Sequence, residues 1–225
     1  MTTSLLTRGT IASVIRNDDH TYEGNLIHYF RAVFNHAQNL GNGYHNFRHL
    51  THVMWLCHEA CLYYATRLSP REMRNLLIAA LFHDFDHTGI SVPDVHNIMR
   101  AVRGLALHLA EEDMPYHVNI ADLIEATEYP HVELSEALSL PARILRDADM
   151  GQSFSVAWIQ QVVFGFSKEW GMPPLEVLKR QEHFHEGLVF ETEWARQKFP
   201  RSAIEAKVAE AREMILLLAD EPVSV

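Results

Sequence analysis

The chain has 225 residues, of which 48% are hydrophobic and 21% charged, and its formal net charge is −10. This length suits one domain with its own core, and no apolar run reaches the roughly 18 residues that a membrane span needs. The negative charge opposes binding to the backbone of long nucleic acid, whereas a small phosphorylated ligand could still bind through a divalent cation. We therefore predict a single domain over residues 1–225, with neither long nucleic acid nor a membrane as partner.

The first 20 residues show little hydrophobic periodicity, and they lack the basic start and apolar centre of a secretory signal. The expected location is therefore cytoplasmic. The sequence leaves open whether residues 1–20 form a helix or a loosely docked arm.

Two amphipathic helices are predicted next. From Tyr22 the apolar residues recur at the i, i+3, i+4, i+7 spacing, and this pattern ends at Leu40-Gly41-Asn42-Gly43. A turn then leads through His45 and His49 into a second helix that runs to about Arg67. Both histidines thus lie at the start of this helix.

A third helix forms the centre of the predicted fold. It begins with Ser69-Pro70-Arg71-Glu72, which combines a serine N-cap, a proline at the first helical position and a capping-box glutamate. Its apolar run ends in the ionisable residues His83, Asp84, Asp86 and His87. Burying these groups would cost several kcal/mol unless they were paired or bound to a cation, so a metal site is predicted here.

The remainder of the chain also has helical patterns. Prolines at or near the predicted boundaries, and the absence of any alternating strand pattern, favour an all-α helical bundle. The further predicted helices are 93–115, 116–129, 133–149, 153–170, 174–199 and 202–219.

The candidate metal ligands are His49, His83, Asp84 and Asp147, each at the end of an apolar stretch, and Asp149 is an adjacent alternative to Asp147. Two imidazoles and two carboxylates suit Zn, Mn, Fe, Co or Mg better than a metal that prefers thiolates. Incomplete coordination by protein leaves room for water, whose pKa a metal lowers. One or two divalent ions are therefore expected as cofactors.

These residues lie in motifs that resemble a known family. The set of His49, His83-Asp84 and Asp147 resembles the signature of the HD-domain metal-dependent phosphohydrolases. The motifs are similar to those of the class I cyclic nucleotide phosphodiesterases and consist of Tyr44-His45-Asn46-x-x-His49-x-x-x-Val53, His83-Asp84-x-Asp86-His87-x-Gly89 and Ala126-Thr127-Glu128-Tyr129-Pro130-His131.

The resemblance implies a role for each matching residue. The first metal would be held by His49, His83, Asp84 and Asp147, with Asp84 bridging to a second metal. His45 would be the general acid, and a metal-activated hydroxide would be the nucleophile. The residues expected to orient ligands and waters, or to contribute to the second metal, are Asn46, Asp86, His87 and His131.

The predicted function is hydrolysis of a phosphomonoester or phosphodiester in a nucleotide or small metabolite. One alternative is a di-iron oxygenase of the HD fold, which would need His108, His117 or His131 to complete a second site. The other is a nucleotide-binding HD signalling module without catalysis. The helices after Ser153 either cover the pocket or form a homodimer interface, and the sequence leaves both open.

Overall fold

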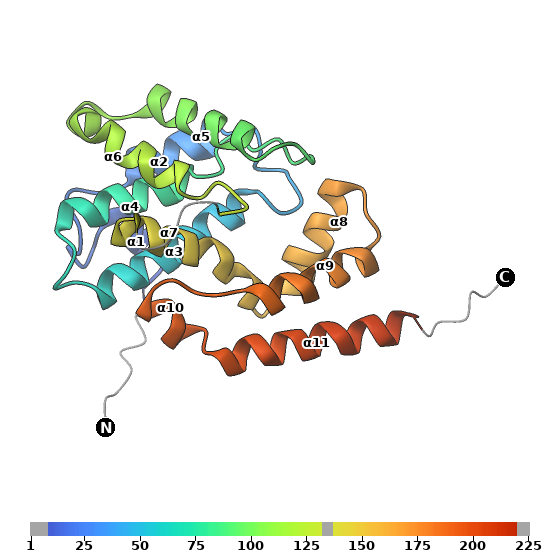
Figure 1. Cartoon of the computed structure of the whole chain (residues 1–225). Helices are drawn as coiled ribbons and strands as arrows, with labels where there is room; N and C mark the ends of the chain where they lie inside the picture. The colour runs from blue at the N-terminus through green and yellow to red at the C-terminus, as the bar shows by residue number, and fades with distance from the viewer. Residues whose placement is uncertain (1–8, 132–136, 220–225) are drawn as a thin grey trace.

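The computed structural model describes residues 9–131 and 137–219. Every regular element in these ranges is helical, which confirms the predicted all-α class (Figure 1). The α-helices are α1 (Ile11–Arg16), α2 (Ile27–His36), α3 (Phe47–Tyr63), α4 (Pro70–Phe82), α5 (Val95–His108), α6 (His117–Glu125), α7 (Leu140–Met150), α8 (Phe164–Trp170), α9 (Pro174–Gly187), α10 (Glu193–Lys198) and α11 (Arg201–Ala219). Shorter elements are the 3₁₀-helices η1 (Glu111–Tyr116) and η3 (Gly151–Phe154) and the π-helix η4 (Ile159–Val163).

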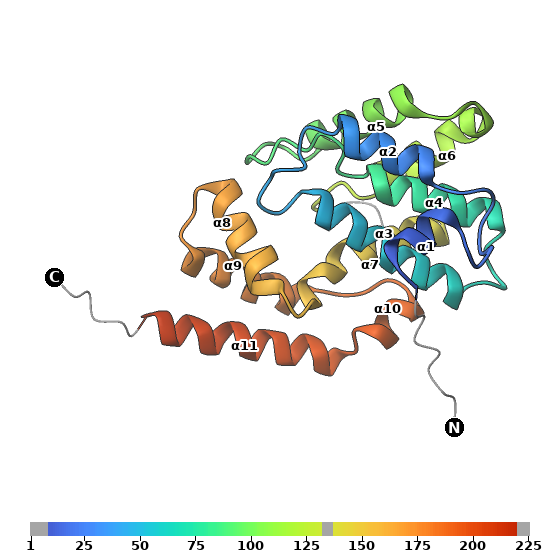
Figure 2. The same cartoon turned by 180° about the vertical axis from the view of Figure 1, so that it is seen from behind.

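Helix α4 is the centre of the main hydrophobic core. Its predicted start is confirmed: the Ser69 hydroxyl accepts a hydrogen bond from the Glu72 N–H at 3.2 Å, and the Glu72 carboxylate accepts one from the Ser69 N–H at 2.8 Å. Residues 76–82 are all fully buried because α2, α3, α5, α6 and α7 pack around the helix (Figure 2). His83 and Asp84 therefore directly follow a helix that is held in place by packing from several sides.

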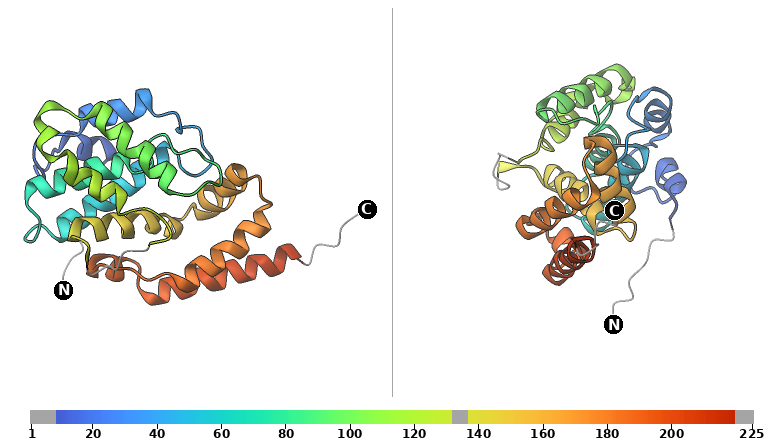
Figure 3. Two further views of the ribbon diagram at one scale, coloured as in Figure 1. Left: turned by 45° about the horizontal axis from the view of Figure 1, so that its top comes forward. Right: turned by 90° about the vertical axis from the view of Figure 1, so that its right-hand side faces the viewer.

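The C-terminal helices form a second hydrophobic cluster. Helix α9 lies along α11, and α8 packs against both η4 and α9 (Figure 3). Trp158 and Val177 are buried in this cluster, and so is Tyr44, which comes from the loop before α3. Because Tyr44 precedes His45, the second cluster anchors the loop that carries the predicted general acid.

Several predicted elements were wrong in their extent. The predicted helix 153–170 is interrupted between η3, which ends at Phe154, and η4, which starts at Ile159, and the predicted helix 93–115 is interrupted between α5 and η1. The pattern over 174–199 predicts one helix, but α9 ends at Gly187 and α10 starts at Glu193, with Leu188 in an extended conformation and Thr192 as the α10 N-cap. Likewise α7 starts at Leu140 after the N-cap Ser139, not at 133. Residues 133–136 of that predicted helix lie outside the described ranges.

The N-terminal segment is docked over the part that the structure describes. Helix α1 has a capping box at Thr10 and buries Val14 and Ile15, and the Tyr22 hydroxyl donates to the Val14 carbonyl. Residues 9–20 are therefore packed on the bundle, whereas residues 1–8 of the predicted arm lie outside the described ranges. No helix in those ranges is long and apolar enough to cross a bilayer.

Candidate metal centre

Three helix ends bring two imidazoles and two carboxylates together. His49 comes from the first turn of α3, His83 is the C-cap of α4 with Asp84 after it, and Asp149 comes from the last turn of α7. The Nε2 atom of His49 lies 3.1 Å from Nε2 of His83 and 3.0 Å from a carboxylate oxygen of each aspartate. The His83 Nε2 lies 3.3 Å from Asp84 and 3.6 Å from Asp149. We call these four residues the histidine–aspartate cluster.

The hydrogen bonds of the two histidines fix which nitrogen faces the cluster. His83 Nδ1 donates to the Ala80 carbonyl at 2.9 Å, and His49 Nδ1 donates to the Gln152 side-chain oxygen. Gln152 is itself oriented, since its amide donates to Gln161 at 3.0 Å. In the neutral rings the Nε2 atoms therefore carry lone pairs that point at each other and at two carboxylates. This convergence of donor atoms fits a divalent cation and suits metals that accept mixed nitrogen and oxygen ligands.

The pKa shifts of the cluster residues also show that the two carboxylates favour positive charge beside them. Burial opposes protonation of His49, yet hydrogen bonds to Asp149 and Asp84 raise its pKa to about 9. His83 is also buried, and Asp84 and Asp149 likewise raise its pKa well above the ordinary value. The two histidines hold the pKa of each aspartate below its usual range despite burial. A bound cation supplies the same charge balance without protons.

The structure does not bring the predicted ligand Asp147 into this cluster. Its carboxylate accepts hydrogen bonds from the backbone N–H groups of Glu191 and Thr192, at 2.8 and 2.7 Å. Burial raises the pKa of Asp147 to about 6, because these bonds only partly offset its desolvation. Residues two apart on an α-helix differ by about 200° in direction, so Asp147 and Asp149 cannot face the same site. Asp149 therefore replaces Asp147 as the fourth candidate ligand.

His45 lies beside the cluster and is paired with a glutamate that the sequence did not predict. The ring centroids of His45 and His49 are 5.9 Å apart. His45 Nδ1 lies 2.8 Å from a carboxylate oxygen of Glu169 on α8, and the other carboxylate oxygen accepts the backbone N–H groups of Tyr44 and His45. Although burial opposes ionisation, His45 and these N–H groups lower the pKa of Glu169. The carboxylate thus orients His45 so that Nε2 is left for proton transfer.

His87 supports His45 from one face of the ring. The two rings stack with centroids 3.6 Å apart. His87 Nδ1 accepts the Gly89 N–H at 3.0 Å, so its Nε2 carries the proton. His45, His87 and Glu169 lie close enough to hold a metal. However, His45 Nδ1 and the Glu169 carboxylate are already bonded to each other, and His87 Nδ1 accepts the Gly89 N–H. The arrangement fits an acid and its supports better than a metal site.

Two other predicted residues, Asn46 and Asp86, accept hydrogen bonds from backbone N–H groups. Asn46 is the N-cap of α3, where its side-chain oxygen accepts the N–H groups of Arg48 and His49 at 2.9 and 3.3 Å. Asp86 has a positive φ of 60°, and its carboxylate accepts the Gln38 N–H at 2.8 Å. Asn46 thus fixes the turn that carries His49, and Asp86 ties the turn after Asp84 to the end of α2.

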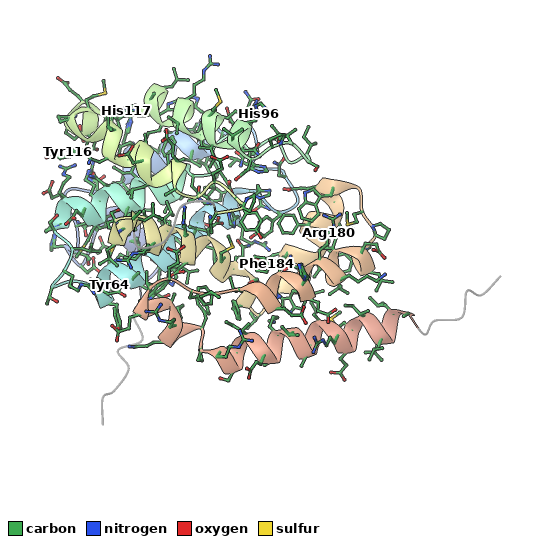
Figure 4. The ribbon with its side chains drawn as sticks, in the orientation of Figure 1. Tyr64, His96, Tyr116, His117, Arg180 and Phe184 are labelled. Carbon is green, nitrogen blue, oxygen red and sulfur yellow. The ribbon has the colours of Figure 1, made fainter. Side chains whose placement is uncertain are left out.

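The remaining candidate histidines lie outside both groups. His131 Nδ1 bonds to the Glu128 carbonyl at 3.2 Å, and its ring lines a cavity of about 280 Å³ with Asp147 and Phe184. His108 stacks on His36. Figure 4 places His117 at the start of α6, across the molecule from α8. Among the described residues, none of His108, His117 and His131 completes a second metal site.

Part of the chain matches a known protein family. The sequence model of the 3'5'-cyclic nucleotide phosphodiesterase family matches residues 44–92. This range contains His45, His49, His83, Asp84 and His87, but it ends before Asp149 and Glu169. No curated protein matches the chain.

The match supports a phosphodiesterase-like hydrolase that uses a divalent metal. It covers the two segments that supply the loop before α3 and the turn after α4. The parts assigned to Asp149 and Glu169 rest on geometry alone.

Proposed function

We propose that this protein is a metal-dependent phosphohydrolase that cleaves a phosphomonoester or phosphodiester bond of a nucleotide or small metabolite. The observation that carries the proposal is the convergence of two imidazole Nε2 atoms and two carboxylate oxygens within 3.0–3.6 Å, beside a histidine held by a glutamate. This combination offers a cation site next to a proton donor, as hydrolysis of a phosphoester requires.

The cation would be held by His49, His83, Asp84 and Asp149. When bound, one or two divalent ions would lower the pKa of coordinated water and offset charge on the phosphoryl oxygens. The Asp84 and Asp149 side chains are 14% and 22% exposed, compared with 0% and 1% for the histidines. The carboxylates therefore form the accessible edge of the cluster, where substrate could approach.

His45 would be the general acid. As the bond between phosphorus and the leaving oxygen breaks, His45 Nε2 donates its proton to that oxygen. Glu169 is bonded to Nδ1 and so keeps Nε2 directed away from itself. A pure nucleotide-binding module has no need for such a pair, so the geometry favours catalysis over binding alone.

The oxygenase alternative receives no comparable support. It depends on extra histidines for a second metal, and His108, His117 and His131 do not join the cluster within the described residues. A phosphohydrolase needs only the donor atoms already brought together.

The test is hydrolysis of methyl phenyl phosphate by protein loaded with Mn, Zn, Co, Mg or Fe. Wild-type protein should release phenol, and His45→Ala should lose about 10²-fold or more in kcat with its metal content unchanged. The control is His96→Ala, an exposed histidine on α5 that should retain wild-type kcat (Figure 4). Failure of the metal-loaded wild type to hydrolyse any phosphoester, or full activity of His45→Ala, would contradict the proposal.

A further inference from the structure

The predicted general acid and the metal ligands come from segments far apart in the sequence. His45 lies in the loop between α2 and α3, whereas Asp84 lies in the turn after α4. If His45 is to protonate the leaving group of a substrate bound at the metal, these two segments must stay at a fixed distance from each other. Misplacement of a reacting group by about 1 Å can cost about 10²-fold in rate. The structure therefore needs a physical link between the two backbones.

Asn39 supplies such a link. Its side-chain NH₂ group donates one hydrogen bond to the His45 carbonyl at 2.8 Å and another to the Asp84 carbonyl at 2.9 Å. Its side-chain oxygen accepts the Asp86 N–H at 3.0 Å. One amide group thus joins the backbone of the proposed acid to the backbone of a proposed ligand.

Because Asn39 is buried, its three hydrogen bonds are costly to break. The residue is 2% exposed, so water cannot readily replace a lost partner. The three bonds use both hydrogens of the amide nitrogen and one lone pair of the oxygen, which fixes the orientation of the side chain. A polar residue buried with this set of partners positions both segments at once.

We propose that Asn39 is a positioning residue that holds His45 at the distance from the histidine–aspartate cluster at which it can protonate the leaving group. This inference rests on the proposed function. Asn39 bonds to backbone atoms of both segments, so it would act on the reaction only by setting where His45 lies relative to Asp84.

The leaving group provides a readout specific to this role. Methyl phenyl phosphate and methyl p-nitrophenyl phosphate differ only in the leaving alcohol, and p-nitrophenoxide departs without needing a proton. Loss of the acid or of its position should therefore slow the phenyl ester selectively. Loss of metal or general disorder of the site should slow both esters alike.

The experiment measures kcat for both esters, and metal content, in Asn39→Asp and Asn39→Ala. Asn39→Asp replaces the bridging NH₂ group with an oxygen that repels both carbonyls, and Asn39→Ala removes the bridge without adding repulsion. Both should lose about tenfold or more on the phenyl ester but less than about threefold on the p-nitrophenyl ester, with metal retained. His45→Ala should show the same selectivity, more strongly.

Asn17 provides a matched control. It is 4% exposed, and its side-chain NH₂ also bridges two backbone carbonyls, those of Tyr22 and Gly24, at 2.5 and 2.8 Å. Asn17→Asp therefore makes the same chemical change at a buried bridge that lies outside the two segments of the site. It should change the ratio of the two rates by less than about threefold.

The possible results distinguish failure of the positioning role of Asn39 from failure of the proposed function. If the metal-loaded wild type cleaves neither ester, or if His45→Ala lacks the leaving-group selectivity, the proposed function fails and this inference fails with it. If both behave as expected but the Asn39 variants slow the two esters equally, or slow neither, the positioning role of Asn39 alone is overturned.

Discussion

In the proposed mechanism, Glu169 determines which ring nitrogen of His45 can donate a proton. One carboxylate oxygen binds His45 Nδ1, and the other accepts two backbone N–H groups from the same loop. The glutamate therefore both orients the ring and immobilises the backbone that carries it.

Replacing Glu169 by glutamine removes the negative charge of the side chain while nearly keeping its size. In Glu169→Gln the side-chain oxygen can still accept the backbone N–H groups, but the new NH₂ group would face His45 Nδ1 and favour the wrong tautomer. We expect kcat for methyl phenyl phosphate to fall by about 10²-fold or more with metal content unchanged. Glu176→Gln, at an exposed position of α9 where the carboxylate pairs with Lys179, should be neutral. An unchanged kcat in Glu169→Gln would show that this carboxylate does not assist the acid.

The sequence could predict some of these residues and not others. His49, His83 and Asp84 stand at the ends of apolar runs, so the local pattern alone made them candidates, and the structure brings them together. Asp147 and Asp149 both follow the apolar face of α7, and only the packing of other segments decides which one faces the cluster. Glu169 lies 124 positions from His45, in a helix with no motif of its own, so no local signal pointed to it.

Two glycines, Gly43 in the loop before α3 and Gly165 in α8, determine how closely α8 approaches the loop that carries His45. A Cβ atom on Gly43 would overlap the Gly165 carbonyl oxygen, and one on Gly165 would lie 2.9 Å from the Gly43 oxygen. Both contacts are to backbone, which cannot rotate out of the way as a side chain can. This close approach is what allows Glu169, one turn further along α8, to reach His45.

Adding a methyl group at Gly43 should therefore move α8 away. We expect Gly43→Ala to lower kcat for methyl phenyl phosphate by about tenfold or more while metal binding persists, because the pairing of Glu169 with His45 is disturbed. Gly41→Ala is the control, since a Cβ there meets nothing within 4 Å. Equal activity of the two variants would show that the close approach does not matter for catalysis.

The break between α9 and α10 explains both the wrong extent of the predicted helix 174–199 and the position of Asp147 outside the histidine–aspartate cluster. Had 174–199 been one helix, the N–H groups of Glu191 and Thr192 would have been bonded within it. In the structure the chain is extended at Leu188, and those N–H groups bind the Asp147 carboxylate. Apolar periodicity continued through this segment, so the tertiary bond that interrupts the helix was invisible in the sequence.

For the whole molecule, the proposed cation would join three helices that enter the cluster from different directions. Helices α3, α4 and α7 each supply a ligand from one end, and all three pack together in the main core. The all-α class was predictable because caps, prolines and periodicity agreed along the chain. The second cluster of α8, α9 and α11 was not, because its aromatic residues suit either a pocket cover or a homodimer interface.

Metal content tests the central claim most directly. The measurement is metal stoichiometry by plasma mass spectrometry on protein purified without chelator or affinity-column metal, for wild type, Asp149→Ala and Asp147→Ala. We expect one or two divalent ions per chain in wild type, loss of metal in Asp149→Ala and retention in Asp147→Ala, whose carboxylate is held by the backbone N–H groups of Glu191 and Thr192. Metal retained in Asp149→Ala but lost in Asp147→Ala, or no metal bound by wild type even after divalent ions are added, would contradict it.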